Sequence, residues 1–184
     1  MKNFTFILAI SCFLGACASN VSRLPALTSE AGAPYVLGAG DALQVVVFGE
    51  ADLSGSYRVS DGGTIAVPLV GVLPAGGLTV AKFRETFIER LKTSAIRSPD
   101  VTVTVSEYRP FFILGEVKTP GLHPYVPNMT VLTAVAIAGG FTFRAAQNDI
   151  SVTRQMEGES RESRALRDSR ILPGDVVYVF ERHL

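Results

Sequence analysis

The sequence has few of the side chains on which most catalytic and metal sites depend. Its 184 residues include two cysteines and two histidines. They contain no H-E-x-x-H or C-x-x-C pair, no G-x-S-x-G nucleophile elbow and no phosphate-binding loop. The Gly38-x-Gly40 pair lacks the third glycine of a dinucleotide fingerprint and precedes a strand pattern, not a helix pattern. We therefore expect no cofactor, no metal and no enzyme activity, with an enzyme of unrecognised type as the alternative.

An excess of charge of one sign is also missing. The chain has 17 basic and 17 acidic residues, for a formal net charge of zero, and no long block of like charge. Nucleic acid is therefore not an expected partner. The composition, 47% hydrophobic and 18% charged, is that of one sizeable globular domain or two small ones.

The N-terminus is typical of an export signal. Lys2 precedes an apolar run from Phe4 to Leu14, which is shorter than the ~20 residues of a membrane-spanning helix. The residues Leu-Gly-Ala-Cys that end at Cys17 resemble the bacterial lipobox, in which the cysteine is lipidated and becomes the first mature residue. We predict a lipoprotein signal peptide over residues 1–16, with a plain secretion signal or a buried core helix as alternatives.

The segment after the signal indicates a membrane anchor and no disulfide. Cys12 lies in the part that would be removed, and lipid on Cys17 leaves no thiol to pair. Ala18 after the cysteine implies the outer membrane for that class of protein. Residues 17–34 are small and polar without a helix or strand period, which predicts a flexible tether.

Residues 35–108 combine short strand patterns with one clear helix pattern. Residues 43–48 are apolar on both faces, which predicts a central strand. Two strand patterns flank the turn residues Asp61, Gly62 and Gly63, which predicts a hairpin with Pro68 where no ladder N–H is needed. An amphipathic helix is predicted from Thr79, its N-cap, to about residue 94, and a half-solvated strand follows over residues 101–105.

Residues 109–184 begin at Arg109-Pro110, where proline marks a boundary. A strand over residues 111–114 is followed by a turn at Pro120 and Gly121, with the return strand expected at Tyr125-Val126. A short helix runs from Thr130 to Gly139 and Gly140, which supply its C-terminal left-handed residues. Strands are predicted over residues 149–155 and 176–180, separated by a polar, mobile segment at residues 157–170.

Two strands begin after the same dipeptide, Gly40-Asp41 and Gly174-Asp175. Glycine supplies the unusual φ, and the aspartate oxygen is expected to accept the N–H two residues on. No histidine or second carboxylate stands at ligand spacing beside either aspartate. Both dipeptides are therefore interpreted as strand starts and not as metal or catalytic sites.

These motifs, in this order, resemble the bacterial outer-membrane polysaccharide export family. Residues 36–83 resemble its polysaccharide export domain, and residues 113–142 resemble the soluble-ligand-binding β-grasp module, SLBB. The positions that carry the resemblance are Gly40, Asp41, Asp61, Gly62, Gly63, Pro68 and Gly71, then Gly115, Pro120, Gly121, Gly139 and Gly140, with Gly174 and Asp175 before the last strand. The implied fold class is α+β, with a strand-rich export domain carrying one packed helix over residues 35–108 and a β-grasp domain over residues 109–184.

The resemblance implies a lipoprotein on the periplasmic face of the outer membrane. Members of this family form a homo-oligomeric ring for capsular or exopolysaccharide cargo, together with an inner-membrane polysaccharide copolymerase. Longer members continue into an amphipathic C-terminal helix, so a chain ending at Leu184 is expected to use a separate partner, such as an outer-membrane β-barrel. The alternatives are a glycan-binding β-grasp lipoprotein that forms no conduit and a structural envelope protein.

Overall fold

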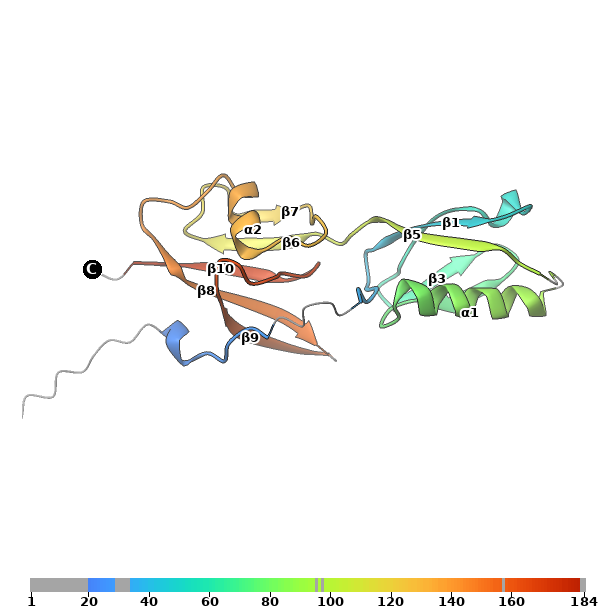
Figure 1. The fold of residues 1–184 in the computed structure, drawn as a ribbon, viewed down its shortest axis with the longest axis horizontal. Helices are drawn as coiled ribbons and strands as arrows, with labels where there is room; N and C mark the ends of the chain where they lie inside the picture. The colour runs from blue at the N-terminus through green and yellow to red at the C-terminus, as the bar shows by residue number, and fades with distance from the viewer. Residues whose placement is uncertain (1–19, 29–33, 95, 97, 157, 183–184) are drawn as a thin grey trace, which may run out of the picture.

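The computed structural model describes residues 20–28, 34–94, 96, 98–156 and 158–182. They form two units that lie end to end, linked by the segment between β5 and β6 (Figure 1). Each unit has its own hydrophobic core. The signal peptide and Cys17 lie outside the described residues.

The first unit is a small sheet and a hairpin packed against one helix. Its sheet has the order β2 (Gly55–Arg58), β1 (Ala42–Val47), β5 (Val101–Glu107), and all pairs are antiparallel. Helix α1 (Val80–Thr93) begins where predicted, and the Thr79 hydroxyl accepts the Lys82 N–H at 3.2 Å. Phe83, Phe87 and Leu91 recur on one helical face and are fully buried.

The predicted hairpin around Asp61 to Gly63 is wrong in its pairing. β2 pairs with β1, whereas β3 (Thr64–Val67) pairs with β4 (Gly71–Pro74). The Gly63 carbonyl accepts hydrogen bonds from the N–H groups of Ala75 and Gly76 at 2.9 and 2.7 Å. This turn is therefore hydrogen-bonded to the residues that follow β4. The sequence shows two strands flanking a turn, but it does not show which edge each strand takes. The central position predicted for β1 is confirmed.

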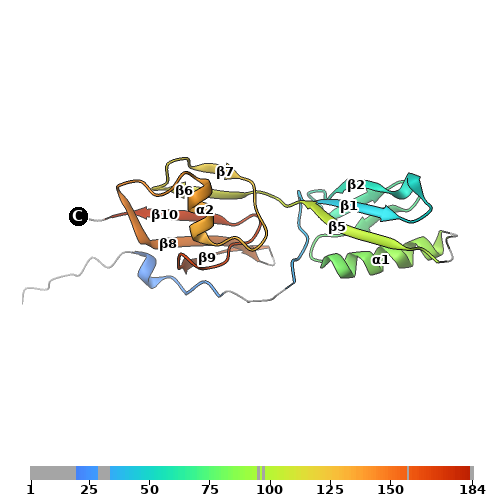
Figure 2. The ribbon, with the colours of Figure 1, turned by 45° about the horizontal axis from the view of Figure 1, so that its top comes forward.

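The second unit is a five-stranded sheet with helix α2 (Val131–Ile137) across one face (Figure 2). The strand order is β7 (Gly121–His123), β6 (Phe111–Gly115), β10 (Val176–Glu181), β8 (Ala145–Met156), β9 (Glu159–Ala165). β6 and β10 are parallel, and the other pairs are antiparallel. Core residues alternate along the strands, with Ile113, Ile150 and Val177 all fully buried.

Two predictions in this unit are wrong. The return strand is β7, opposite β6 with Phe111 facing His123, and not Tyr125-Val126. The polar segment at 157–170 contains the edge strand β9, which pairs with β8 from Ile150 to Met156. The inward side chains of β9 are Ser163, which is polar, and Ala165, which is small, so they create no clear apolar alternation.

The predicted flexible tether is also wrong over residues 20–28. η1 (Asn20–Arg23) lies beside β8 with Val21 fully buried, and Ala26 forms a parallel bridge to Arg164 of β9. The Leu27 N–H donates to the Arg164 carbonyl at 2.7 Å, and the Arg164 N–H donates to the Pro25 carbonyl at 2.8 Å. The unpaired backbone groups of an edge strand explain this, because they can order a segment that has no period of its own.

Candidate functional site at the junction of the two units

The first Gly-Asp turn places a buried carboxylate at the end of the first unit. Gly40 has φ 93°, which glycine adopts readily, and Asp41 is fully buried. The Asp41 Oδ2 accepts the Gly38 N–H at 2.8 Å, and the Asp41 N–H donates to the Gly38 carbonyl at 3.2 Å. The carboxylate therefore caps the turn that precedes it, which corrects the expectation that it accepts an N–H two residues on.

The second Gly-Asp turn has the same local geometry. Gly174 has φ 85°, and the Asp175 carboxylate accepts the Leu172 N–H at 2.7 Å. Arg154 of β8 binds this carboxylate through two nitrogens, with Nε–Oδ1 2.9 Å and Nη2–Oδ2 2.7 Å. Because Arg154 belongs to the same sheet, this ion pair stays within the second unit.

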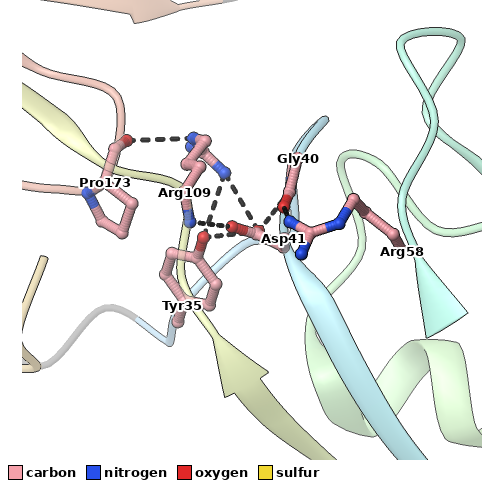
Figure 3. Close-up of polar contacts among 7 residues, drawn as sticks. Tyr35, Gly40, Asp41, Arg58, Arg109 and Pro173 are labelled. Carbon is pink, nitrogen blue, oxygen red and sulfur yellow. Dashed lines mark hydrogen bonds and ion pairs between the residues drawn. The ribbon is translucent and has the colours of Figure 1, made fainter. Parts of the chain in front are cut away.

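Arg109 binds the Asp41 carboxylate from the segment between the units (Figure 3). Its backbone N–H donates to Asp41 Oδ1 at 2.8 Å, and its Nη1 donates to Oδ2 at 3.1 Å. Its Nε donates to the Pro173 carbonyl at 3.0 Å, next to the second Gly-Asp turn. One guanidinium thus joins the first turn of the first unit to the last turn of the second.

Two backbone positions next to the Arg109 side chain leave no space for a Cβ atom. A Cβ on Gly38 would lie 2.2 Å from Arg109 Nη1, and a Cβ on Gly174 would lie 2.9 Å from Arg109 Nε. The two glycines therefore leave the space that the guanidinium occupies. Neither was singled out from the sequence for this reason, because the close approach involves residues far apart in the chain.

Tyr35 completes the polar network. Its hydroxyl donates to Asp41 Oδ2 at 2.5 Å and accepts from Arg109 Nη1 at 3.0 Å. Burial, followed by the hydrogen bond to the Asp41 carboxylate, raises the pKa of Tyr35 well above its usual value of 10.0. The Asp41 carboxylate thereby accepts four hydrogen bonds, from Gly38, Tyr35 and twice from Arg109. A carboxylate has about four acceptor positions, so this one is saturated and suited to hold structure, not to react.

An aromatic row runs beside the network. Tyr108, the residue before Arg109, lies edge-to-face with Tyr35 at 5.0 Å between ring centroids and with Tyr125 of the second unit at 5.6 Å. The Tyr125 hydroxyl donates to the Ile171 carbonyl at 3.3 Å, and burial raises the pKa of Tyr125. The junction therefore has a charged side and an aromatic side, and each connects the two units.

The other motif positions lie at turns. Asp61, Gly62 and Gly63 connect β2 to β3, Pro68 lies in the β3–β4 turn and Gly71 begins β4. Pro120 precedes β7, Gly121 begins it, and Gly139 and Gly140 follow α2. Gly115 ends β6 where a Cβ would lie 2.0 Å from the Val179 carbonyl oxygen, so only glycine permits the approach of β10. The fold distributes these residues over both units, and Arg109 connects the two Gly-Asp turns across the junction.

The sequence did not reveal the residues that complete this site. In the sequence Arg109 is only the residue before a proline, and Tyr35 and Arg154 belong to no motif. Within the described residues, no group of three or more histidine, cysteine, aspartate or glutamate side chains is placed to hold a metal ion. None of the helices in the described ranges has the length and apolar character needed to cross a membrane.

Two family descriptions match this chain. Residues 29–106 match the polysaccharide biosynthesis/export protein family, and residues 110–165 match the SLBB domain. The matches occur in the order of the two structural units, on either side of Arg109. The chain therefore combines a domain of the polysaccharide export family with an SLBB domain. The resemblance seen in the sequence motifs and the α+β fold class are both confirmed.

Relatives of this export-family chain are named for polysaccharide transport. The exopolysaccharide production protein ExoF of Rhizobium meliloti is 40% identical over 60% of this chain and 26% of ExoF. The EPS I polysaccharide export outer membrane protein EpsA of Ralstonia nicotianae is 33% identical over 81% of this chain and 48% of EpsA. The polysialic acid transport protein KpsD of Escherichia coli is 27% identical over 65% of this chain and 22% of KpsD. The chain thus spans about half the length of these relatives or less.

Proposed function

We propose that this chain is a periplasmic, outer-membrane-anchored component of a machine that exports capsular polysaccharide or exopolysaccharide. Copies of the chain form an oligomeric ring that lines the path of the polymer, and no bond is made or broken in the process. The relatives support the cargo class, because their names refer to exopolysaccharide production, polysaccharide export and polysialic acid transport.

The observation that carries the proposal is the junction between the export unit and the SLBB unit. Arg109 binds Asp41 of one unit and the Pro173 carbonyl next to the Gly-Asp turn of the other. A conduit wall built from two-unit subunits needs a fixed relation between the units, because a change of angle in one subunit would misalign its neighbours. A saturated, buried ion-pair network supplies that fixed relation.

The path of the N-terminal segment supports the anchoring. η1 lies beside β8 at the end of the SLBB unit that is far from the export unit, and residues 24–28 run from there along β9 toward the export unit (Figure 1). Lipid on Cys17, three residues before η1, would therefore attach the SLBB end to the membrane. The export unit would project into the periplasm, toward an inner-membrane polysaccharide copolymerase.

The anchoring is tested by Cys17→Ser. We expect the variant to leave the outer-membrane fraction and to appear in the soluble periplasm or as an uncleaved precursor. Two acyl chains give stable attachment, whereas a protein with none depends on its partners. A variant that stays in the outer membrane as before would refute the lipid anchor.

The export role is tested by deleting the gene and staining surface polysaccharide. We expect loss of surface polymer and recovery with the wild-type chain, and unchanged polymer would refute the role. The ring is tested by measuring the mass of the detergent-solubilised protein together with its partners. A strictly monomeric species would contradict a conduit and would favour a glycan-binding lipoprotein.

A further inference from the structure

A groove of about 460 Å³ opens on the aromatic side of the junction. The end of β5 and the segment that leads into β6 form one wall, and the β7 strand with the loop after it forms the other. Small-molecule sites of about 300–1,000 Å³ are found preferentially where domains meet. The groove lies on both units, so its shape depends on the contacts that hold them together.

Most of the groove surface is flat and apolar. Tyr108 and Tyr125 line it, together with three prolines. Leu122 and Val126 add apolar surface and are 58% and 51% exposed. Aromatic and proline rings present rigid faces that lose little conformational freedom when a ligand packs on them. Sugar rings have complementary C–H faces, whose hydroxyl edges remain free to bind polar groups.

The polar groups of the groove favour a neutral ligand. Its nine lining residues, all in the described part of the chain, include one carboxylate, Glu107, and no cationic side chain. The Glu107 carboxylate binds Arg58 at 2.7 Å and is 65% exposed, so it has acceptor capacity left for hydroxyl groups. The Ser106 hydroxyl donates to the Ala42 carbonyl, which leaves its oxygen free to accept. Both oxygens can accept hydrogen bonds from sugar hydroxyls, whereas a uronate or sialate carboxylate offers them no proton and is repelled by Glu107.

We propose that this groove binds a short, neutral stretch of polysaccharide, with sugar rings packed on Tyr108, Tyr125 and Leu122. The assignment rests on the proposed export function and makes it more specific. The polymer contacts the wall at the seam between the two units. Because the contacts are few, each subunit holds the chain weakly enough to release it.

The test is calorimetric titration of the full chain in detergent. The probes are neutral oligosaccharides obtained by partial hydrolysis of the polysaccharide that the strain secretes, and hexagalacturonate as an acidic comparison. The chain has no tryptophan, so tyrosine fluorescence gives a second readout. If the groove is occupied, the change in fluorescence should come mainly from Tyr108 and Tyr125. We expect saturable binding of the neutral probe and at least about tenfold weaker binding of the acidic one. Absence of neutral binding, or tighter binding of hexagalacturonate, would overturn the proposal.

Matched variants locate the binding. Leu122→Ser with Val126→Ser should weaken neutral binding by about tenfold or more, because apolar contact is lost. Leu132→Ser is the control, since Leu132 lies on α2 outside the groove and is similarly exposed at 50%. Glu107→Gln should keep neutral binding and strengthen binding of hexagalacturonate. Equal effects of the groove and control variants would place the ligand elsewhere.

The outcomes separate this site from the export role. Loss of surface polymer in the gene deletion, combined with no oligosaccharide binding, would refute the groove and leave the export role standing. Unchanged surface polymer in the gene deletion, combined with specific oligosaccharide binding, would refute the export role and leave the groove standing. If the groove variants change the oligomer mass and leave oligosaccharide affinity unaltered, the groove is a subunit contact and the proposal is wrong.

Discussion

The two Gly-Asp turns have the same backbone geometry, but the arginine that binds the aspartate comes from a different part of the chain in each. In both, a glycine with positive φ precedes a buried aspartate whose carboxylate accepts the N–H three residues earlier. Asp175 is bound by Arg154 from its own sheet, whereas Asp41 is bound by Arg109 from the segment between the units. The same local motif therefore stabilises one unit in the first case and connects two units in the second.

The difference shows how a buried charge can determine domain geometry. A buried carboxylate needs partners, because an unpaired buried charge is strongly unfavourable. Where the partner comes from the same unit, the requirement stabilises the fold. Where it comes from a linker, the linker must take one position. The Arg109 side chain is 28% exposed while Asp41 is fully buried, so water reaches the arginine end of this connection and not the carboxylate.

The largest effect is expected from Asp175→Ala. Arg154, whose side chain is 16% exposed, would lose both contacts to the carboxylate. We expect the second unit to lose about 3–5 kcal/mol of unfolding free energy, measured by chemical denaturation. Asp168→Ala, the same change at an exposed aspartate, is the control and should be near neutral. Equal effects of the two substitutions would show that the buried pair is not important for stability.

Arg109→Ala should lower the unfolding free energy less than Asp175→Ala does, but it should change the relative orientation of the two units more. Asp41 keeps the hydrogen bonds from Gly38, Tyr35 and the backbone N–H of residue 109, so we expect a loss of about 1–3 kcal/mol. The units should no longer keep one relative orientation, which small-angle scattering would detect as a broader distance distribution. Arg109→Lys should not restore it, because an ammonium cannot reproduce the guanidinium fork. The control is Arg58→Ala, whose exposed ion pair with Glu107 does not connect the units. If Arg109→Ala gave the same scattering profile as the wild type, the proposed role of Arg109 would be contradicted.

Alanine at the two turn glycines compares the turns directly. Gly40→Ala and Gly174→Ala each force a residue with a Cβ to positive φ, at a cost of about 1 kcal/mol. Gly174→Ala should also displace the Arg109 side chain, because the new Cβ would lie 2.9 Å from Nε, whereas the Cβ at Gly40 meets only Arg109 Cβ at 3.5 Å. Melting temperatures report the strain, and scattering reports the junction. Gly62→Ala is the control, since its nearest contact would be 3.9 Å away. Identical behaviour of all three variants would mean that neither turn needs glycine.

The smallest effect is expected from Tyr35→Phe, which should change how the stability of the protein depends on pH. The pKa of Tyr35 is raised in the folded chain, so above pH 10.0 the unfolded chain loses this proton first and stability falls as pH rises. A single such tyrosine contributes a slope of up to about 1.4 kcal/mol per pH unit there. The variant should show a shallower decline above pH 10.0, although Tyr57 and Tyr125, whose pKa values burial also raises, keep part of it. An unchanged slope in alkaline unfolding would show that burial and Asp41 do not raise the pKa of Tyr35 in the folded chain.

Features that depend on neighbouring residues could be predicted from the sequence. Helices α1 and α2 begin at the predicted Thr79 and Thr130 caps, because capping and an apolar face are local properties. The motifs at the turns were sufficient to indicate the α+β class and the export family, since turn residues at fixed spacings depend on short-range geometry.

The contacts between distant segments become visible only in the folded chain. The tertiary structure placed β2 beside β1, turned a polar segment into β9 and laid residues 20–28 along that strand's edge. It also brought Arg109 to Asp41, 68 residues away, and to the Pro173 carbonyl, 64 residues away. Pairings of this kind leave no period in the sequence, because they depend on edges and buried charges that exist only after each unit has folded.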